Sequence, residues 1–224
     1  LGNNFGTTNK TGDSANEGGF TLGTVSFGYG VSLSEDAGGN ARLAVGASGA
    51  TKAFGGTCST NCGAVYLFTF ADTDNEDFSG GALASVIGIE YDNNYSGNAN
   101  PRSGRDINMT GVIGNTDLFG IDVSLTYDSS LGTHRLAGVA KQDDGGSGGA
   151  DTDNGAVHLF TFTDDSFSGA DHVGTIGHSY SGTSSFDYQV TSTETWGGGM
   201  SSVALDGNYL AIGSQYTTVT NNED

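Results

Sequence analysis

Short apolar runs separated by clusters of Gly, Asp and Asn make up most of the chain. Runs such as AVYLFTF at 64–70 are strand-sized, and no stretch shows the 3.6-residue period of an amphipathic helix. The pattern therefore predicts an almost wholly β protein. The expected strands cover 29–34, 42–47, 64–70, 82–88, 121–126, 135–140, 156–162, 172–177, 201–205 and 209–213.

One eight-residue phrase occurs twice: GAVYLFTF at 63–70 returns as GAVHLFTF at 155–162, with Tyr66 replaced by His158. The segments around the phrase align as well, 27–47 with 119–140 and 77–88 with 166–177. A third copy of the first two runs follows at 198–214. Such self-similarity indicates tandem copies of one supersecondary unit.

The chain is predicted to carry about two and a half copies of a unit of roughly 80–90 residues. The expected divisions are a connecting segment (1–26), a first repeat unit (27–118), a second repeat unit (119–196) and a partial third unit (197–224). Because the sequence shows neither an initiator Met nor a signal peptide, we expect a mature or excised piece of a longer protein.

The faces of these strands indicate how the units pack. In AVYLFTF both faces are apolar, so this strand should be covered on both sides. In LAVGA, Ala44 and Gly46 share one face, where a neighbouring sheet could approach closely. Small four-stranded antiparallel sheets covered on both faces by copies of themselves are the blades of a β-propeller.

The order of the motifs, FG, then VSL, then RLAVGA, then GAVYLFTF, resembles the FG-GAP-type repeats of integrin α-subunit propellers and of many bacterial surface proteins. The resemblance implies propeller blades, an extracellular or cell-surface location, and a role in adhesion or assembly. That family commonly has a D-x-D-x-D-G calcium loop before the LAVGA-like strand. Here the corresponding hairpins read SEDAGGNA, TYDSSLGTH and LDGN, so the usual calcium site is absent.

Two and a half blade-like units cannot close a propeller, which has about four to eight blades. Either further repeats of the same parent chain complete the structure, or neighbouring molecules do. The third unit ends before a GAV-LFTF strand and should leave an open edge at 209–213, for which residues 1–26 of a neighbour are a plausible complement. Head-to-tail self-association of this kind gives a ring or a filament.

The composition excludes several classes of partner. With 26 Asp and Glu against 7 Lys and Arg, the formal net charge is −19, which disfavours binding to nucleic acid or to an anionic membrane surface. No apolar run reaches the roughly 18 residues of a spanning helix, so membrane insertion is not expected. The 12 Phe and 9 Tyr argue against a disordered chain in spite of 39 Gly. An acidic surface suits cations, particularly calcium.

Two acidic segments are candidate calcium sites, because calcium prefers several oxygen ligands on a carboxylate-rich loop. Neither follows the EF-hand spacing, so solvated acidic turns remain the alternative. The candidate ligands are Asp143, Asp144, Asp151 and Asp153 in the loop 141–155, and Asp72, Asp74, Glu76 and Asp77 after the long strand.

The two cysteines, Cys58 and Cys62 in CSTNC, are expected to form a disulfide in an exported protein. Closing so small a loop contributes about 2 kcal/mol in the chain-entropy model. Free thiols are the alternative, and a metal site is disfavoured because a second ligand pair at suitable spacing is missing.

No residue cluster indicates an enzyme. GGSGG at 145–149 satisfies G-x-S-x-G around Ser147, but no helical pattern follows it, as a nucleophile elbow requires. The four histidines fit no zinc spacing, and His158 is interpreted as a packing or surface variant of Tyr66. Trp196 is expected to pack between units, or to stack on a sugar.

We therefore predict a structural or adhesive repeat segment of a secreted or cell-surface protein that associates with itself. The alternative is a carbohydrate-binding, lectin-like propeller with glycan partners. The loops AFGGTCSTNC and DDGGSGGADTDN differ strongly between the two full units, which weakens the expectation of a sugar site repeated in each unit.

Overall fold

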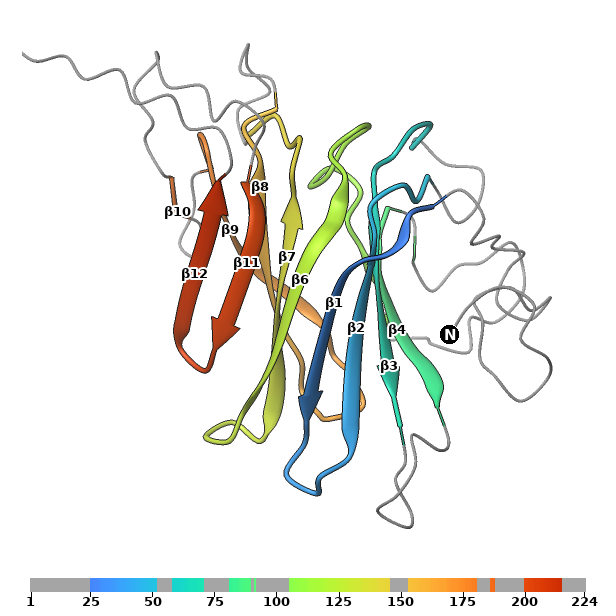
Figure 1. Ribbon diagram of the computed structural model, residues 1–224, viewed down its shortest axis with the longest axis vertical. Helices are drawn as coiled ribbons and strands as arrows, with labels where there is room; N and C mark the ends of the chain where they lie inside the picture. Colours follow the sequence, from blue (N-terminus) through green and yellow to red (C-terminus); the bar gives the residue numbers. More distant parts are fainter. Residues whose placement is uncertain are drawn as a thin grey trace, which may run out of the picture.

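The computed structural model describes an all-β protein in which the sheets lie one after another along the chain (Figure 1). The described residues are 25–51, 58–70, 81–89, 91, 105–145, 153–180, 186–187 and 200–214. No helix occurs among them, and therefore none that is long and apolar enough to cross a membrane.

The first sheet follows the order of the sequence, each strand lying beside the next. It contains β1 (Phe27–Glu35), β2 (Ala41–Ala47), β3 (Ala64–Thr69), β4 (Ala82–Gly88) and the two-residue β5 (Ile107–Asn108). Strands β1 to β4 pair antiparallel, and β5 pairs parallel with β4. The central strand β3 is buried on both faces, as its apolar sequence predicts.

The second sheet repeats this arrangement. It contains β6 (Phe119–Asp128), β7 (Thr133–Ala140), β8 (Ala156–Thr161), β9 (Asp171–Gly177) and β10 (Phe186–Asp187). Its first four strands are antiparallel, and β10 pairs parallel with β9 as β5 does with β4. The third sheet contains two described strands, β11 (Met200–Asp206) and β12 (Tyr209–Ser214), joined as a hairpin.

All ten strands expected from the sequence are present, and the four-stranded antiparallel order of each full repeat is confirmed. Two short parallel strands, β5 and β10, were not expected. Each has only two residues, between stretches rich in Gly, Ser and Asn, so no periodicity marks it. Each adds a fifth strand by parallel pairing, which only the tertiary fold brings about.

The three sheets stack face to face, and their first strands β1, β6 and β11 lie side by side (Figure 1). Strand β6 contacts β1 and β2, and β11 contacts β6 and β7 in the same way. One apolar core lies between the first and second sheets and includes Leu67, Val123, Leu125 and Phe160. A second core, with Ala137, Val157 and Val203, lies between the second and third.

Glycine explains the FG motif and the close approach of the first two sheets. Gly28 and Gly120 have φ of +91° and +82° at register shifts in β1 and β6, a conformation that L side chains rarely adopt. A Cβ on Gly46 would overlap the carbonyl oxygen of Gly120. The prediction that a neighbouring sheet approaches closely at Gly46 is therefore confirmed.

Candidate functional site

The junction between the first and second sheets combines apolar packing with a serine that caps an edge strand. Val123 and Leu125 of β6 are only 3% and 4% exposed. The amide of Leu125 points out of the second sheet and donates to Ser32 Oγ of β1 at 2.9 Å. An unpaired amide at a buried sheet edge would cost about 1–3 kcal/mol, so the serine satisfies a group that the fold has to bury.

The junction between the second and third sheets repeats this contact at equivalent positions. The amide of Leu205 donates to Ser124 Oγ at 2.9 Å, and that of Val203 donates to Asp122 Oδ2 at 2.8 Å. Ser124 aligns with Ser32, and Leu205 with Leu125. The same packing of one sheet on the next, called a step below, therefore occurs twice within the chain.

An arginine at the start of each second strand also crosses the junction. Arg42 pairs with Asp36 at 2.6 Å and donates through Nε to the Asp165 carbonyl of the second sheet at 2.7 Å. Its equivalent, Arg135, pairs with Asp128 and donates to Asn208 Oδ1 of the third sheet at 2.6 Å. Burial opposes ionisation of Asp36, but its hydrogen bonds with Asn40 and the Arg42 charge hold the pKa below its usual value.

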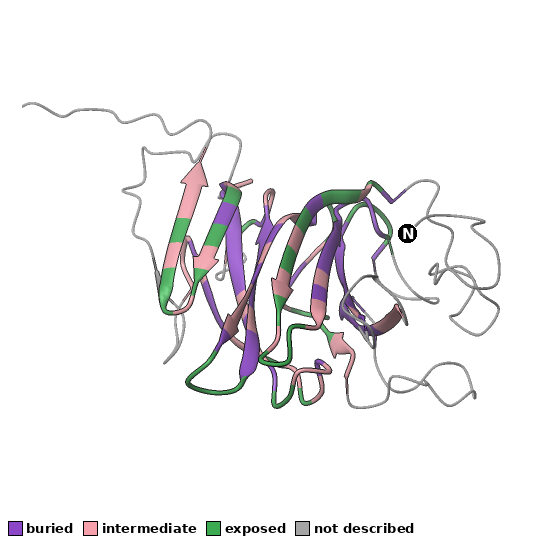
Figure 2. Cartoon of the chain, turned by 60° about the horizontal axis from the view of Figure 1, so that its bottom comes forward, coloured by how far each residue is buried: buried purple, intermediate pink, exposed green. Residues whose placement is uncertain are grey.

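The two ends of the stack leave these surfaces open among the described residues (Figure 2). On β1, Tyr29, Val31 and Leu33 are 69%, 57% and 56% exposed. Val31 and Leu33 occupy the positions that Val123 and Leu125 fill in the buried junction. At the other end, the outer face of β11 and β12 exposes the small side chains Ser202, Ala204 and Ala211 and, near the turn, Tyr209, which is 82% exposed. Strand β12 pairs with β11 alone among the described strands.

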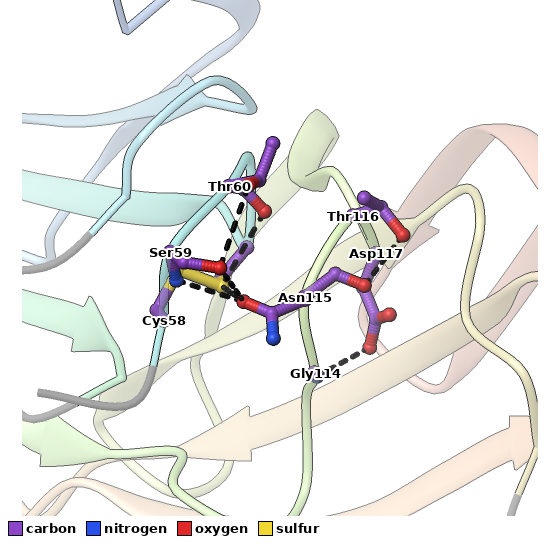
Figure 3. Close-up of a disulfide and its surroundings, with 8 residues drawn as sticks. Cys58, Ser59, Thr60, Gly114, Asn115, Thr116 and Asp117 are labelled. Atoms are coloured by element: carbon purple, nitrogen blue, oxygen red, sulfur yellow. Dashed lines mark hydrogen bonds between the residues drawn. A yellow bond between two sulfur atoms is a disulfide. The ribbon is translucent and has the colours of Figure 1, made fainter.

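The disulfide between Cys58 and Cys62 is present, as predicted, with Cα atoms 6.1 Å apart (Figure 3). Its loop holds the segment that leads into β6: the amides of Thr116, Leu118 and Phe119 donate to the carbonyls of Thr60, Asn61 and Cys62 at 2.8–3.0 Å. The Ser59 amide donates to Asn115 Oδ1 at 2.8 Å. The disulfide thus fixes the connection between the first and second sheets.

A buried polar cluster lies in the second sheet. His158 Nδ1 is 3.1 Å from Thr175 Oγ1 and 3.3 Å from His172 Nε2, while His158 Nε2 is 3.5 Å from Asp143 Oδ2. Asp143 Oδ1 accepts from the Tyr180 hydroxyl at 2.6 Å and from the Gly145 amide at 2.8 Å. His158 is fully buried, so it is a packing residue and not a surface variant.

The charges of this cluster shift its pKa values. Burial and the neighbouring His158 lower the pKa of His172 to about 4. Burial raises the pKa of Asp143. The interaction with His158 and the hydrogen bonds from Tyr180 and the Gly145 amide lower it by more, so the pKa of Asp143 lies below its usual value. Burial, aided by the charges of Asp143, Asp144 and Asp153, raises the pKa of Asp117 to about 7.

The order carboxylate, imidazole, hydroxyl in Asp143, His158 and Thr175 is also that of nucleophilic triads. In this protein His158 and Thr175 are 0% and 2% exposed. A substrate carbonyl therefore cannot reach Thr175 Oγ1 in this structure, and the cluster acts in packing. Ser147 and Trp196 lie outside the described residues.

The structure places three of the predicted calcium ligands. Asp143 is buried in the cluster, and Asp144, at the surface, accepts from the Asp153 amide at 3.1 Å. Within the described part of the chain, no group of three or more His, Cys, Asp or Glu is placed to hold a metal ion. Calcium binding remains a prediction, since the other candidates, Asp72, Asp74, Glu76, Asp77 and Asp151, lie outside the described residues.

Sequence reasoning missed Asp117, His172, Thr175 and Tyr180 as members of one cluster. The repeat alignment contained a signal, because the equivalent positions of the first sheet carry Val25, Leu83, Val86 and Tyr91. A search of protein-family models finds no match to the chain, and a search of curated proteins finds none either.

Proposed function

We propose that the chain is a structural or adhesive repeat segment of a secreted or cell-surface protein, built from propeller-type blades and able to associate with further sheets of its own kind. One observation carries the proposal: two successive sheet-to-sheet junctions use the same serine and apolar contacts, and an arginine at the same position crosses each of them to its own partner. The disulfide is consistent with an oxidising extracellular environment.

The resemblance to FG-GAP-type repeats supports the blade interpretation at the level of motif order. The hairpins that would carry calcium in that family are organised differently here. Asp36 and Asp128 accept backbone amides of their own turns and pair with Arg42 and Arg135. In both hairpins an arginine side chain thus supplies the positive charge that faces the aspartate.

Sedimentation velocity over a range of concentrations, together with electron microscopy of the native material, tests the proposal. We expect concentration-dependent association into rings or filaments. Because a net charge of −19 makes copies repel one another, association should strengthen as salt screens that charge. A chain that stays monomeric at all concentrations and salt levels would contradict self-association.

A further inference from the structure

We propose that the exposed face of β1 in one copy docks onto the outer face of the β11–β12 hairpin in a second copy, and that this contact repeats the step between the sheets within the chain. The inference rests on the proposed function and names the two surfaces that meet. The contact would join two different surfaces of the chain and would therefore be heterologous, so further copies can add to each end of the assembly.

The face that docks is the stripe Val31 and Leu33 on β1, which are 57% and 56% exposed. Its equivalents Val123 and Leu125 are buried against the first sheet, and Val203 is buried against the second. Burial of these two side chains in a contact between copies would remove their apolar surface from water, which favours association. Two large apolar side chains exposed next to each other on one face of a strand are typical of an interaction surface.

The receiving face has the shape that the internal junction requires. Within the chain, Ala44 and Gly46 of β2 receive the apolar side chains and backbone of β6. Strand β12 has Ala211 and Gly213 at the equivalent positions, and Ala211 is exposed. Gly28 of an incoming β1 could then approach Gly213 as Gly120 approaches Gly46.

Two strands are enough to receive the incoming strand. Inside the chain the first strand of a sheet packs mainly on the first two strands of the preceding sheet, since β6 contacts β1 and β2 and β11 contacts β6 and β7, with far fewer contacts to β3 and β8. The β11–β12 hairpin supplies such a pair. The contact therefore does not need the further strands that a complete third sheet would have.

The external junction lacks two contacts of the internal junctions, the arginine and the serine. Tyr209 stands at the position of Arg42 and Arg135. Ala204 stands where Ser32 and Ser124 accept the Leu125 and Leu205 amides. The Leu33 amide of an incoming copy would therefore find no hydroxyl at this position. The contact between copies should be weaker than the junctions within the chain, and therefore reversible.

The first test changes each face by one charge. Leu33→Asp places a carboxylate in the stripe and should weaken association at least tenfold. Leu131→Asp is the matched control, because Leu131 is 59% exposed in the β6–β7 turn, away from the stripe, and the charge change is the same. Ala211→Asp on β12 should weaken association as Leu33→Asp does. Circular dichroism checks that each variant folds.

Mixing distinguishes this contact from a symmetric one. A Leu33→Asp chain keeps its β12 face, and an Ala211→Asp chain keeps its β1 face, so the mixture should give one-to-one dimers although neither variant associates alone. Ala204→Ser should strengthen association of the otherwise unchanged chain about two- to tenfold, by restoring one hydrogen bond.

Several results would overturn the inference. If the native chain associates but Leu33→Asp does not weaken it, the proposed function stands and this contact is wrong. If Ala211→Asp associates like the native chain, or the mixture gives no dimers, the partner face is wrong. If the native chain does not associate at all, both proposals fail.

Discussion

The first and second sheets share their strand order and pairing, yet they differ at five equivalent positions on the face of β2–β4 or β7–β9. The first sheet has Val25, Ala50, Tyr66, Leu83 and Val86, and the second has Asp117, Asp143, His158, His172 and Thr175. In the first sheet these side chains join an apolar core, in which the Tyr66 and Tyr91 hydroxyls lie 2.9 Å apart. In the second, Asp143, His172 and Thr175 form the polar cluster around His158, and the charge of Asp143 acts on the nearby Asp117.

The comparison shows that equivalent backbones accommodate an apolar set in one sheet and a polar set in the other. The same backbone bonds are made in both sheets: the Gly49 and Gln142 amides donate to the carbonyls at the Val25 and Asp117 positions. Each polar side chain of the set has a partner: His158 lies beside Thr175, His172 and Asp143, and the Asp117 carboxylate accepts from the Gly114 amide. A mixed set, part apolar and part polar, should be worse than either pure set.

The largest expected effect comes from removing one polar member alone. Asp143→Ala gives the second sheet the residue that the first has as Ala50. The Tyr180 hydroxyl and the Gly145 amide then lose their acceptor, and His158 Nε2 loses the carboxylate that lies 3.5 Å away. Because each orphaned buried group costs about 1–3 kcal/mol, we expect the free energy of unfolding to fall by about 3 kcal/mol or more in urea titrations.

Asp144→Ala is the matched control for that loss. It removes a carboxylate from the adjacent residue, but this side chain is exposed. Surface substitutions of this kind usually change stability by less than about 0.5 kcal/mol. If Asp143→Ala and Asp144→Ala lowered the free energy of unfolding equally, the loss would not come from the buried cluster.

The second prediction concerns the connection between the two sheets. Reduction of Cys58–Cys62, or Cys58→Ser with Cys62→Ser, should lower the free energy of unfolding by about 2 kcal/mol, the value expected for closing so short a loop. Because the loop holds the segment before β6, hydrogen exchange should speed up at Leu118 and Phe119 before it does in β8. Exchange that speeds up equally everywhere would show that the disulfide does not hold this connection.

The ten strands and the disulfide could be predicted from the sequence, because apolar alternation, turn residues and the spacing of two cysteines are local signals. The cluster could not be assembled in this way. Asp143 lies in a loop where the two units differ in length, and His158 and His172 belong to neighbouring strands whose register only the structure fixes. The five differences form one set only because the fold brings them to one face of the sheet, and the sequence alone does not show this.

The third prediction concerns the pH dependence of stability, which arises from titrating side chains that the second sheet has at positions where the first has apolar ones. The pKa of His172 is lowered to about 4 in the folded protein, whereas an unfolded histidine titrates near 6.5. Between these values the unfolded state binds more protons, so stability falls as the pH is lowered from 6.5 to 4. One group contributes at most about 1.4 kcal/mol per pH unit. His172→Leu, which copies Leu83, should remove this part of the pH dependence in urea titrations.

Asp117 serves as a control, because its contribution to the pH dependence of stability has the opposite sign to that of His172. Its pKa is raised to about 7, so the folded state keeps a proton that the unfolded state releases above about pH 4. Stability therefore falls as the pH rises from 4 to 7, and Asp117→Asn should remove that fall. If His172→Leu and Asp117→Asn changed the pH dependence in the same direction, the assignment of at least one of the two groups would be wrong.

The smallest net effect is expected when all five positions change together to the residues of the first sheet. Asp117→Val, Asp143→Ala, His158→Tyr, His172→Leu and Thr175→Val remove every polar member of the set except Tyr180. The new tyrosine would face Tyr180 as Tyr66 faces Tyr91, so the remaining hydroxyl keeps a partner. Replacing a buried polar network by apolar side chains that pack well is often neutral or stabilising. We therefore expect the five-residue variant to be at least as stable as the native chain in urea titrations, although Asp143→Ala alone, or His158→Tyr alone beside Asp143, is clearly destabilised. Losses that simply add over the five single variants would show that the sheets are not interchangeable versions of one packing arrangement.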